Sequence, residues 1–250
     1  MQQGPTQATG NVELKERLLF VNDACIVINK LSGESSESIN LPGDLIPPGK
    51  LPLPVHRLDM PVTGCLLLAR NHEAAAFLGA AFAAHDGRGE KRYWAIIERP
   101  PSDMVLPSSG ELIHWLIENR KANKSFAVKE DPPSQKGRRP HPKKAILRYR
   151  LTGEGDHYLF MEIDLITGRR HQIRSQLAAV GLHIKGDLKY GARRSEKAGG
   201  IRLHAYSLAF PNPLAPGETI RVKAAPPIMD SLWTACANSF IGNANNADVK

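Results

Sequence analysis

Short apolar runs separated by turn residues form much of this 250-residue chain. Runs of about 4–8 such residues predict β-strands, and we expect them over residues 18–30 (two strands joined by a turn), 65–69, 92–98, 145–151, 158–166 and 201–210. Two segments predict helices. The first follows Asn71, a favourable N-terminal cap, and extends to about residue 85, and the second extends from about Arg169 to Gly181.

The order of these elements predicts the fold class. Strands outnumber helices and do not alternate with them regularly, which is typical of an α+β fold. We therefore expect a mixed, mostly antiparallel central sheet with flanking helices. Residues 18–235 are predicted to form one domain, between a flexible N-terminal tail over residues 1–17 and a polar C-terminal tail over residues 236–250.

Composition excludes several classes of protein. With 42% hydrophobic and 23% charged residues, the chain is not intrinsically disordered. Three scattered cysteines are too few for a disulfide framework or a closed zinc site, so we expect a reducing compartment, the cytoplasm, and no metal. The polar first ten residues lack the apolar core of a signal peptide. Residues 74–84 form the longest apolar stretch, which is shorter than the roughly 20 residues that span a bilayer.

Positive charge is not spread evenly along the chain. The chain has 33 Lys and Arg against 25 Asp and Glu, and residues 136–150 hold seven of the basic residues and no acidic one. This segment is either a solvated surface or a hairpin that contacts phosphates, and Lys143 and Lys144 belong to it. Arg169 and Arg170 are predicted in the first turn of the second helix, where cations oppose the helix dipole. A bound anion would explain them.

Asp59 is the candidate for a reactive carboxylate. It follows His56 and Arg57 and comes just before a turn containing Pro61 and Gly64. A carboxylate in this position either caps the turn or carries chemistry. The residue types alone leave both interpretations open.

Five segments together resemble the signature of the RluA-type family of RNA pseudouridine synthases, and they span most of the chain. The segments, in chain order, are His56-Arg57-Leu58-Asp59 with Thr63-Gly64, Lys91-Arg92-Tyr93, the stretch TGRRHQIR over residues 167–174, Gly186-Asp187 with Tyr190-Gly191, and Arg202-Leu203-His204-Ala205. The resemblance implies the pseudouridine synthase fold with a catalytic cleft in the 18–235 domain. It also implies a reaction that breaks the C1′–N1 bond of a uridine, turns the base and rejoins it through C5, with no cofactor.

The resemblance also assigns roles. Asp59 is the nucleophile or general base, Arg174 is its cationic partner, and Tyr93 lies against the uracil, where its hydroxyl helps to remove the C5 proton. Because the uridine must leave its stack, Arg57 is the candidate to replace it there. The residues expected to contact RNA are Arg57, Arg169 and Leu203, together with Lys143 and Lys144, which are expected there because of the charge of their segment.

We expect a monomer that acts on rRNA or tRNA, with no membrane or metal partner and no S4-type RNA-binding domain. A glycosidase is disfavoured because most use a second neighbouring carboxylate, which Asp59 lacks in its motif. A catalytically silent RNA-binding protein with the same fold is the alternative. It would share the basic surfaces of the enzyme, and replacing Asp59 separates the two.

Overall fold

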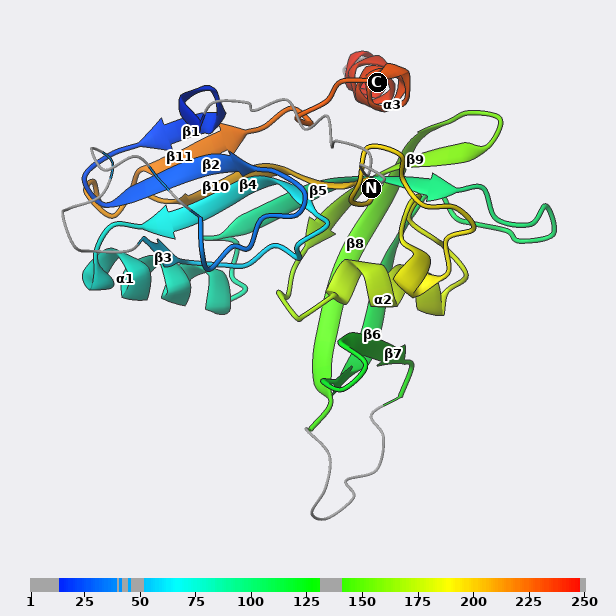
Figure 1. Cartoon of the computed structure of the whole chain (residues 1–250), viewed down its shortest axis with the longest axis horizontal. Helices are drawn as coiled ribbons and strands as arrows, with labels where there is room; N and C mark the ends of the chain where they lie inside the picture. The colour runs from blue at the N-terminus through cyan, green and yellow to red at the C-terminus, as the bar shows by residue number, and fades with distance from the viewer. Residues whose placement is uncertain (1–13, 40, 42–44, 46–51, 131–140, 248–250) are drawn as a thin grey trace, which may run out of the picture.

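A large mixed sheet forms the centre of the computed structural model in Figure 1, which describes residues 14–39, 41, 45, 52–130 and 141–247, with side chains up to residue 240. Eleven strands and three α-helices lie in the described part. The strands are β1 (Leu18–Val21), β2 (Cys25–Lys30), β3 (Leu53–Pro54), β4 (Thr63–Ala69), β5 (Glu90–Glu98), β6 (Ser109–Asn119), β7 (Lys124–Val128), β8 (Lys143–Glu154), β9 (Tyr158–Leu165), β10 (Leu203–Pro211) and β11 (Thr219–Lys223). The helices are α1 (His72–Ala83), α2 (Gln172–Ala179) and α3 (Ser231–Ala247), with 3-10 turns η1 (Leu14–Arg17) and η2 (Leu188–Tyr190).

The strands run in the order β1-β2-β4-β10-β5-β9-β8-β6-β7, with β3 paired to β4 and β11 paired to β10. Among the described strands, β4 and β10 pair in parallel and the other pairs are antiparallel. The α+β prediction of a mixed, mostly antiparallel sheet is confirmed.

The first hairpin shows why the apolar runs become strands. The Asn22 side chain accepts hydrogen bonds from the amides of Ala24 (2.9 Å) and Cys25 (2.8 Å), which closes the predicted turn. The apolar residues of β2 and β4 then face each other across the sheet, as in the pair Ile28 and Leu66, and both side chains are fully buried.

The parallel contact between β4 and β10 requires a glycine. Gly64 has a φ of +115°, and a Cβ added there would lie 2.3 Å from the Ala205 carbonyl oxygen. Only glycine permits both this backbone conformation and this close approach. The contact fixes the loop that precedes β4 against the start of β10.

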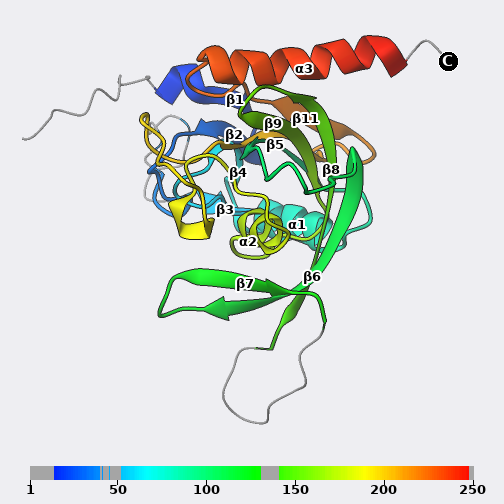
Figure 2. The same cartoon turned by 90° about the vertical axis from the view of Figure 1, so that its right-hand side faces the viewer.

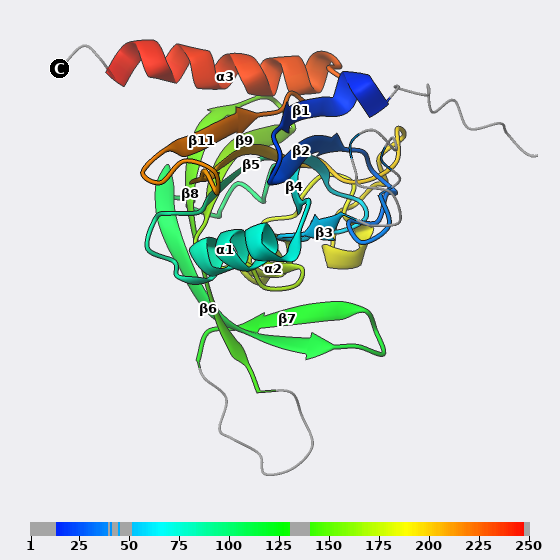
Figure 3. The ribbon, with the colours of Figure 1, turned by 90° about the vertical axis from the view of Figure 1, so that its left-hand side faces the viewer.

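The helices lie on both sides of the sheet. In the views of Figures 1 and 3, α1 and α2 lie below it and α3 lies above it. The predicted cap of α1 is confirmed, because the Asn71 side chain accepts a hydrogen bond of 2.8 Å from the Ala74 amide. The predicted start of the second helix is wrong. Because His171 has a left-handed backbone (φ +53°), α2 begins at Gln172, and Arg169 and Arg170 precede it.

Two features differ from the prediction: additional strands and the structure of the C-terminal segment. The β6–β7 hairpin, which extends away from the body in Figure 2, and β11 were not predicted. Helix α3 crosses residue 236, where the tail was expected. Its Trp233 and Cys236 are buried against Trp94 and Phe160 of the sheet, so this part of the chain belongs to the folded domain. No helix in the described segments is long and apolar enough to cross a membrane.

Candidate active site

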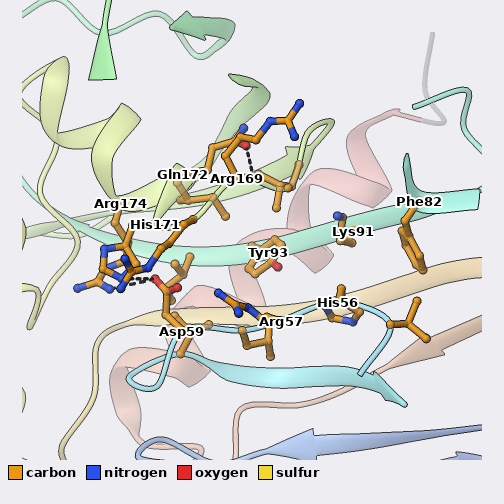
Figure 4. A pocket seen from close by; sticks show the side chains of 18 of the residues that line it. His56, Arg57, Asp59, Phe82, Lys91, Tyr93, Arg169, His171, Gln172 and Arg174 are labelled. Carbon is orange, nitrogen blue, oxygen red and sulfur yellow. Dashed lines mark hydrogen bonds and ion pairs between the residues drawn. The ribbon is translucent and has the colours of Figure 1, made fainter. Parts of the chain in front are cut away.

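The loop between β3 and β4, strand β5, helix α2 and the start of β10 enclose a cavity of about 480 Å³. Figure 4 shows the side chains that line it. Asp59 comes from the loop, Tyr93 from β5, Arg174 from α2 and Leu203 from β10. The fold thus brings together four predicted site residues that are separated by up to 144 positions in the sequence.

Arg174 links two carboxylates. Its Nη1 donates a hydrogen bond of 2.9 Å to Asp59, and its Nε and Nη2 donate bonds of 2.7 and 2.8 Å to the two oxygens of Asp187. Arg174 and Asp187 are almost fully buried, whereas the Asp59 side chain is 22% exposed and faces the cavity. Burial alone would lower the pKa of Arg174, but the two carboxylates raise it above its ordinary value. Arg174 therefore stays charged and fixed beside Asp59.

Tyr190 supports the same arrangement from behind. The Arg174 guanidinium lies 4.9 Å from the centre of the Tyr190 ring. The Tyr190 hydroxyl accepts from the Ser125 amide (2.8 Å) and contacts His171 Nδ1 (2.9 Å), whose other ring nitrogen is 3.8 Å from Asp59. Burial lowers the pKa of His171 to about 4, so His171 is neutral at physiological pH. This chain of contacts ties β7 to the carboxylate.

The loop that carries Asp59 is held by a lysine. The side chain of Lys30 is fully buried, and its Nζ donates to the carbonyl oxygens of Leu31 (2.8 Å), Val62 (2.8 Å) and Met60 (3.3 Å). Two of these carbonyls lie immediately beyond Asp59 in the chain. The ammonium thus ties the end of β2 to the turn after Asp59, where the Met60 carbonyl also accepts from the Gly33 amide (2.7 Å).

Tyr93 and Leu203 form apolar walls of the cavity. Both are buried, with exposed fractions of 5% and 2%. Burial, together with the nearby charge of Asp59, raises the pKa of the Tyr93 hydroxyl above its ordinary value. The phenol is thus neutral at physiological pH.

The predicted RNA-contacting residues lie in different places. Arg57 lines the cavity with an exposed side chain that pairs with Glu37 at 2.6 Å. Arg169 also lines the cavity, and its Nε donates to the carbonyl oxygen of Lys144 (3.3 Å). Lys143 and Lys144, at the start of β8, are exposed and do not line the cavity.

Two charge predictions need correction. Arg169 and Arg170 do not form the first turn of α2, as was predicted, but precede its N-cap His171. The basic segment 136–150 also has acidic neighbours from other strands: Arg148 pairs with Glu111 on β6 and Arg150 with Glu162 on β9, each at 2.9 Å. Residues 136–140 of the predicted hairpin lie outside the described residues.

Sequence reasoning assigned no role to Lys30, Lys91, Asp187 or Tyr190. The last three lie within the family motifs, so their positions were marked but their contacts were not. In the described part of the chain, no group of three or more His, Cys, Asp or Glu residues is placed to hold a metal ion.

The family model described as RNA pseudouridylate synthase matches residues 26–179, which is more than half of the chain. The chain belongs to the RNA pseudouridylate synthase family. It is therefore an enzyme of the RNA pseudouridine synthase class, and the resemblance of its motifs is confirmed.

Relatives of this pseudouridine synthase have names that refer to different RNAs. The tRNA pseudouridine synthase C of Haemophilus ducreyi is 31% identical over 205 residues, which cover 75% of this chain and 76% of that protein. The ribosomal large subunit pseudouridine synthase D of Zymomonas mobilis is 31% identical over 204 residues, which cover 78% of this chain but 58% of that protein. The solved structure of human RNA pseudouridylate synthase domain containing 4 has the same fold, with a TM-score of 0.66 and 22% identity over 91% of this chain and 94% of that one.

Proposed function

We propose that this enzyme converts a uridine of a structured tRNA or rRNA to pseudouridine, with Asp59 as the catalytic carboxylate acting on a flipped-out nucleotide. The observation that carries the proposal is the bond between Asp59 and Arg174 in the cavity, because it supplies a negative charge that is held in one orientation. The buried partner Asp187 fixes Arg174 from the other side.

The reaction breaks the C1′–N1 bond and forms a C1′–C5 bond, while the C5 proton leaves and N1 gains a proton. No electrons are exchanged with another molecule. A carboxylate beside the sugar serves this reaction as a nucleophile toward sugar or base, or as a base toward a sugar proton. Each role requires an ionised Asp59, and the Arg174 guanidinium donates a hydrogen bond of 2.9 Å that holds this carboxylate in place.

We assign Tyr93 and Leu203 to the two sides of the uracil ring. Their buried positions on β5 and β10 give the cavity apolar walls against which a planar base packs. The raised pKa of Tyr93 argues against an ionised Tyr93 that removes the C5 proton by itself. Holding the base is therefore its main role in this proposal.

Extraction of the uridine costs a few kcal/mol of stacking and pairing. Arg57 lines the cavity with an exposed guanidinium, so we assign it to the space that the uridine leaves. Arg169, Lys143 and Lys144 are assigned to phosphates. The proposal includes a monomer in the cytoplasm, in keeping with three cysteines that are free and buried.

The test is to replace Asp59 by Asn and by Ala and to measure the release of tritium from C5 of uridine in RNA together with pseudouridine mapping. Mapping of total RNA from cells with and without the gene supplies the substrate. We expect loss of conversion with little loss of RNA affinity. A matched control is Asp164→Asn, which removes a half-exposed carboxylate that pairs with Arg92 away from Asp59.

Two results would overturn the proposal. If Asp59→Ala still converts uridine, another group carries out the reaction. If the unmodified protein binds RNA tightly and leaves every uridine unchanged, it is a silent RNA-binding protein.

A further inference from the structure

Among the described residues, a second buried cation of the cavity has no acidic partner. Lys91, on β5, has an exposed fraction of only 7%, and its Nζ lies over the ring of Phe82, 5.2 Å from the ring centre. Among the described residues, no carboxylate forms an ion pair with it. The contrast with Arg174 is clear, because Arg174 is bound by two carboxylates in the same cavity.

Next to Lys91 lie another positively charged residue and a turn whose backbone is not covered by a side chain. A Cβ placed on Gly168 would lie 2.9 Å from the Lys91 Nζ, so the turn that leads into α2 comes directly against the ammonium without a side chain between them. Arg169 follows in this turn and also lines the cavity. Burial, and then the charge of Arg169, lower the pKa of Lys91 to about 8. Most Lys91 side chains are nevertheless protonated at neutral pH.

A buried cation without a partner is unfavourable for folding. Two neighbouring cations that are not paired with an acid become more favourable when an anion enters between them. RNA supplies one such anion per nucleotide, its phosphodiester group. We propose that Lys91, together with Arg169, binds the backbone phosphate next to the target uridine, and this proposal rests on the proposed function of the cavity.

The register of β5 supports this assignment. Lys91 and Tyr93 are two residues apart on one strand, so their side chains lie on the same face at a spacing of about 6.6–6.8 Å. In Figure 4 Tyr93 lies between Asp59 and Lys91. A uracil packed against Tyr93, with its sugar at Asp59, therefore leaves an adjacent phosphate within reach of the Lys91 end of the cavity.

The experiment measures binding and turnover separately for Lys91→Met and Lys91→Arg. The matched control is Arg92→Met, which removes a positive charge from the next residue, on the opposite face of β5, where it pairs with Asp164 at 3.0 Å. The substrate is an RNA stem-loop around the mapped uridine. In a series of such RNAs, each phosphate near the target is replaced in turn by an uncharged methylphosphonate.

We expect Lys91→Met to weaken RNA binding roughly 10- to 100-fold, as for the removal of one charge-assisted hydrogen bond. The slope of log K against log salt should become less steep by about 0.7, the value for one phosphate of a single strand. For the unmodified protein, one particular methylphosphonate should weaken binding by a similar factor. For Lys91→Met, that same replacement should have no further effect. Lys91→Arg should retain most of the affinity and the slope.

Two results would overturn the assignment. One is a Lys91→Met protein that folds, binds RNA with unchanged affinity and salt slope, and turns over slowly, because Lys91 would then act on the base. The other is equal sensitivity of Lys91→Met and the unmodified protein to every methylphosphonate. Because binding is measured without turnover, the series can also be built on a stem-loop chosen for tight binding alone. A protein that binds this RNA but never converts uridine refutes the proposed function, while the series still decides whether Lys91 binds a phosphate.

Discussion

Removal of Arg174 is the sharpest test of the buried ion-pair network. In Arg174→Ala the Asp187 carboxylate, which is 2% exposed, loses both of its bonds to the guanidinium, and Asp59 loses one. Removing one partner of a buried pair costs about 3–5 kcal/mol, because the remaining charge is left without compensation. Domains of this kind have only about 5–15 kcal/mol of total stability. We expect the free energy of unfolding of Arg174→Ala to fall by about 3–5 kcal/mol.

In Arg174→Ala the buried carboxylate of Asp187 has lost the guanidinium that it binds, and this leads to a second prediction. In the double variant Arg174→Ala/Asp187→Asn the charge that caused most of the destabilisation is gone. We expect it to be more stable than Arg174→Ala alone by about 1–3 kcal/mol, the usual coupling energy of residues in contact. Urea unfolding followed by circular dichroism measures both. Destabilisation that simply adds across the two substitutions would refute the reasoning.

Activity should respond differently from RNA affinity. Arg174→Lys keeps the charge but cannot make three bonds to two carboxylates from one planar group. We expect a folded protein whose turnover falls by about 100-fold, the effect of a misplaced group in an active site. RNA affinity should fall by less than tenfold, so the binding free energy should weaken by less than about 1.4 kcal/mol. Equal losses of turnover and affinity would identify Arg174 as a binding residue instead.

Two further predictions concern charge and pH. Replacing Lys143 and Lys144 by Ala should make the slope of log K for RNA binding against log salt less steep, by about 0.7–0.9 for each phosphate that these lysines bind. The control, replacement of Arg221 and Lys223 of β11, should leave the slope as it is. An unchanged slope after replacement of Lys143 and Lys144 excludes these two lysines from the interface. Burial lowers the pKa values of His171 and His204 to about 4 from the ordinary value of 6.5, so between these values the unfolded chain binds more protons than the folded one. The free energy of unfolding should therefore decrease as the pH is lowered from 6.5 toward 5. Urea unfolding at several pH values measures this, and a free energy of unfolding that stays constant over this range would contradict the prediction.

The sequence predicted the inner part of the sheet better than its edge. Strands β2, β4, β5, β9 and β10 carry long apolar runs because they are buried, and these runs are visible in the sequence. The outer hairpin of β6 and β7 has few buried positions, so its apolar residues do not form a clear pattern. The start of α2 was missed for another reason: His171 has a left-handed backbone, uncommon for a residue other than glycine, and its side chain contacts Tyr190, 19 residues further along the chain.

In the candidate site, too, local motifs were visible in the sequence, whereas contacts between distant residues were not. Short motifs marked Asp59, Tyr93 and Arg174, and the fold places all three in one cavity. The partner of Arg174 on its other side, Asp187, also lies in a motif, but its bond to the guanidinium depends on the packing of two segments 13 residues apart. The absence of an acidic partner for Lys91 among the described residues also required the structure, since a sequence does not show which charges are paired.

The cavity thus contains two buried cations whose energetic roles are opposite, and this difference can be measured in the free protein. Arg174 is compensated by two carboxylates, so its removal destabilises the fold. Lys91 pairs with no carboxylate in the described part of the chain, so its replacement by the uncharged Met should raise the free energy of unfolding at pH 7 while RNA binding weakens. Because the pKa of Lys91 in the folded state, about 8, lies below its ordinary value of 10.5, the gain should be largest below pH 8 and shrink between pH 8 and 10.5. A Lys91→Met protein that is less stable than the unmodified one across this range would show that the ammonium is a structural contact, and would remove the argument that the site awaits an anion.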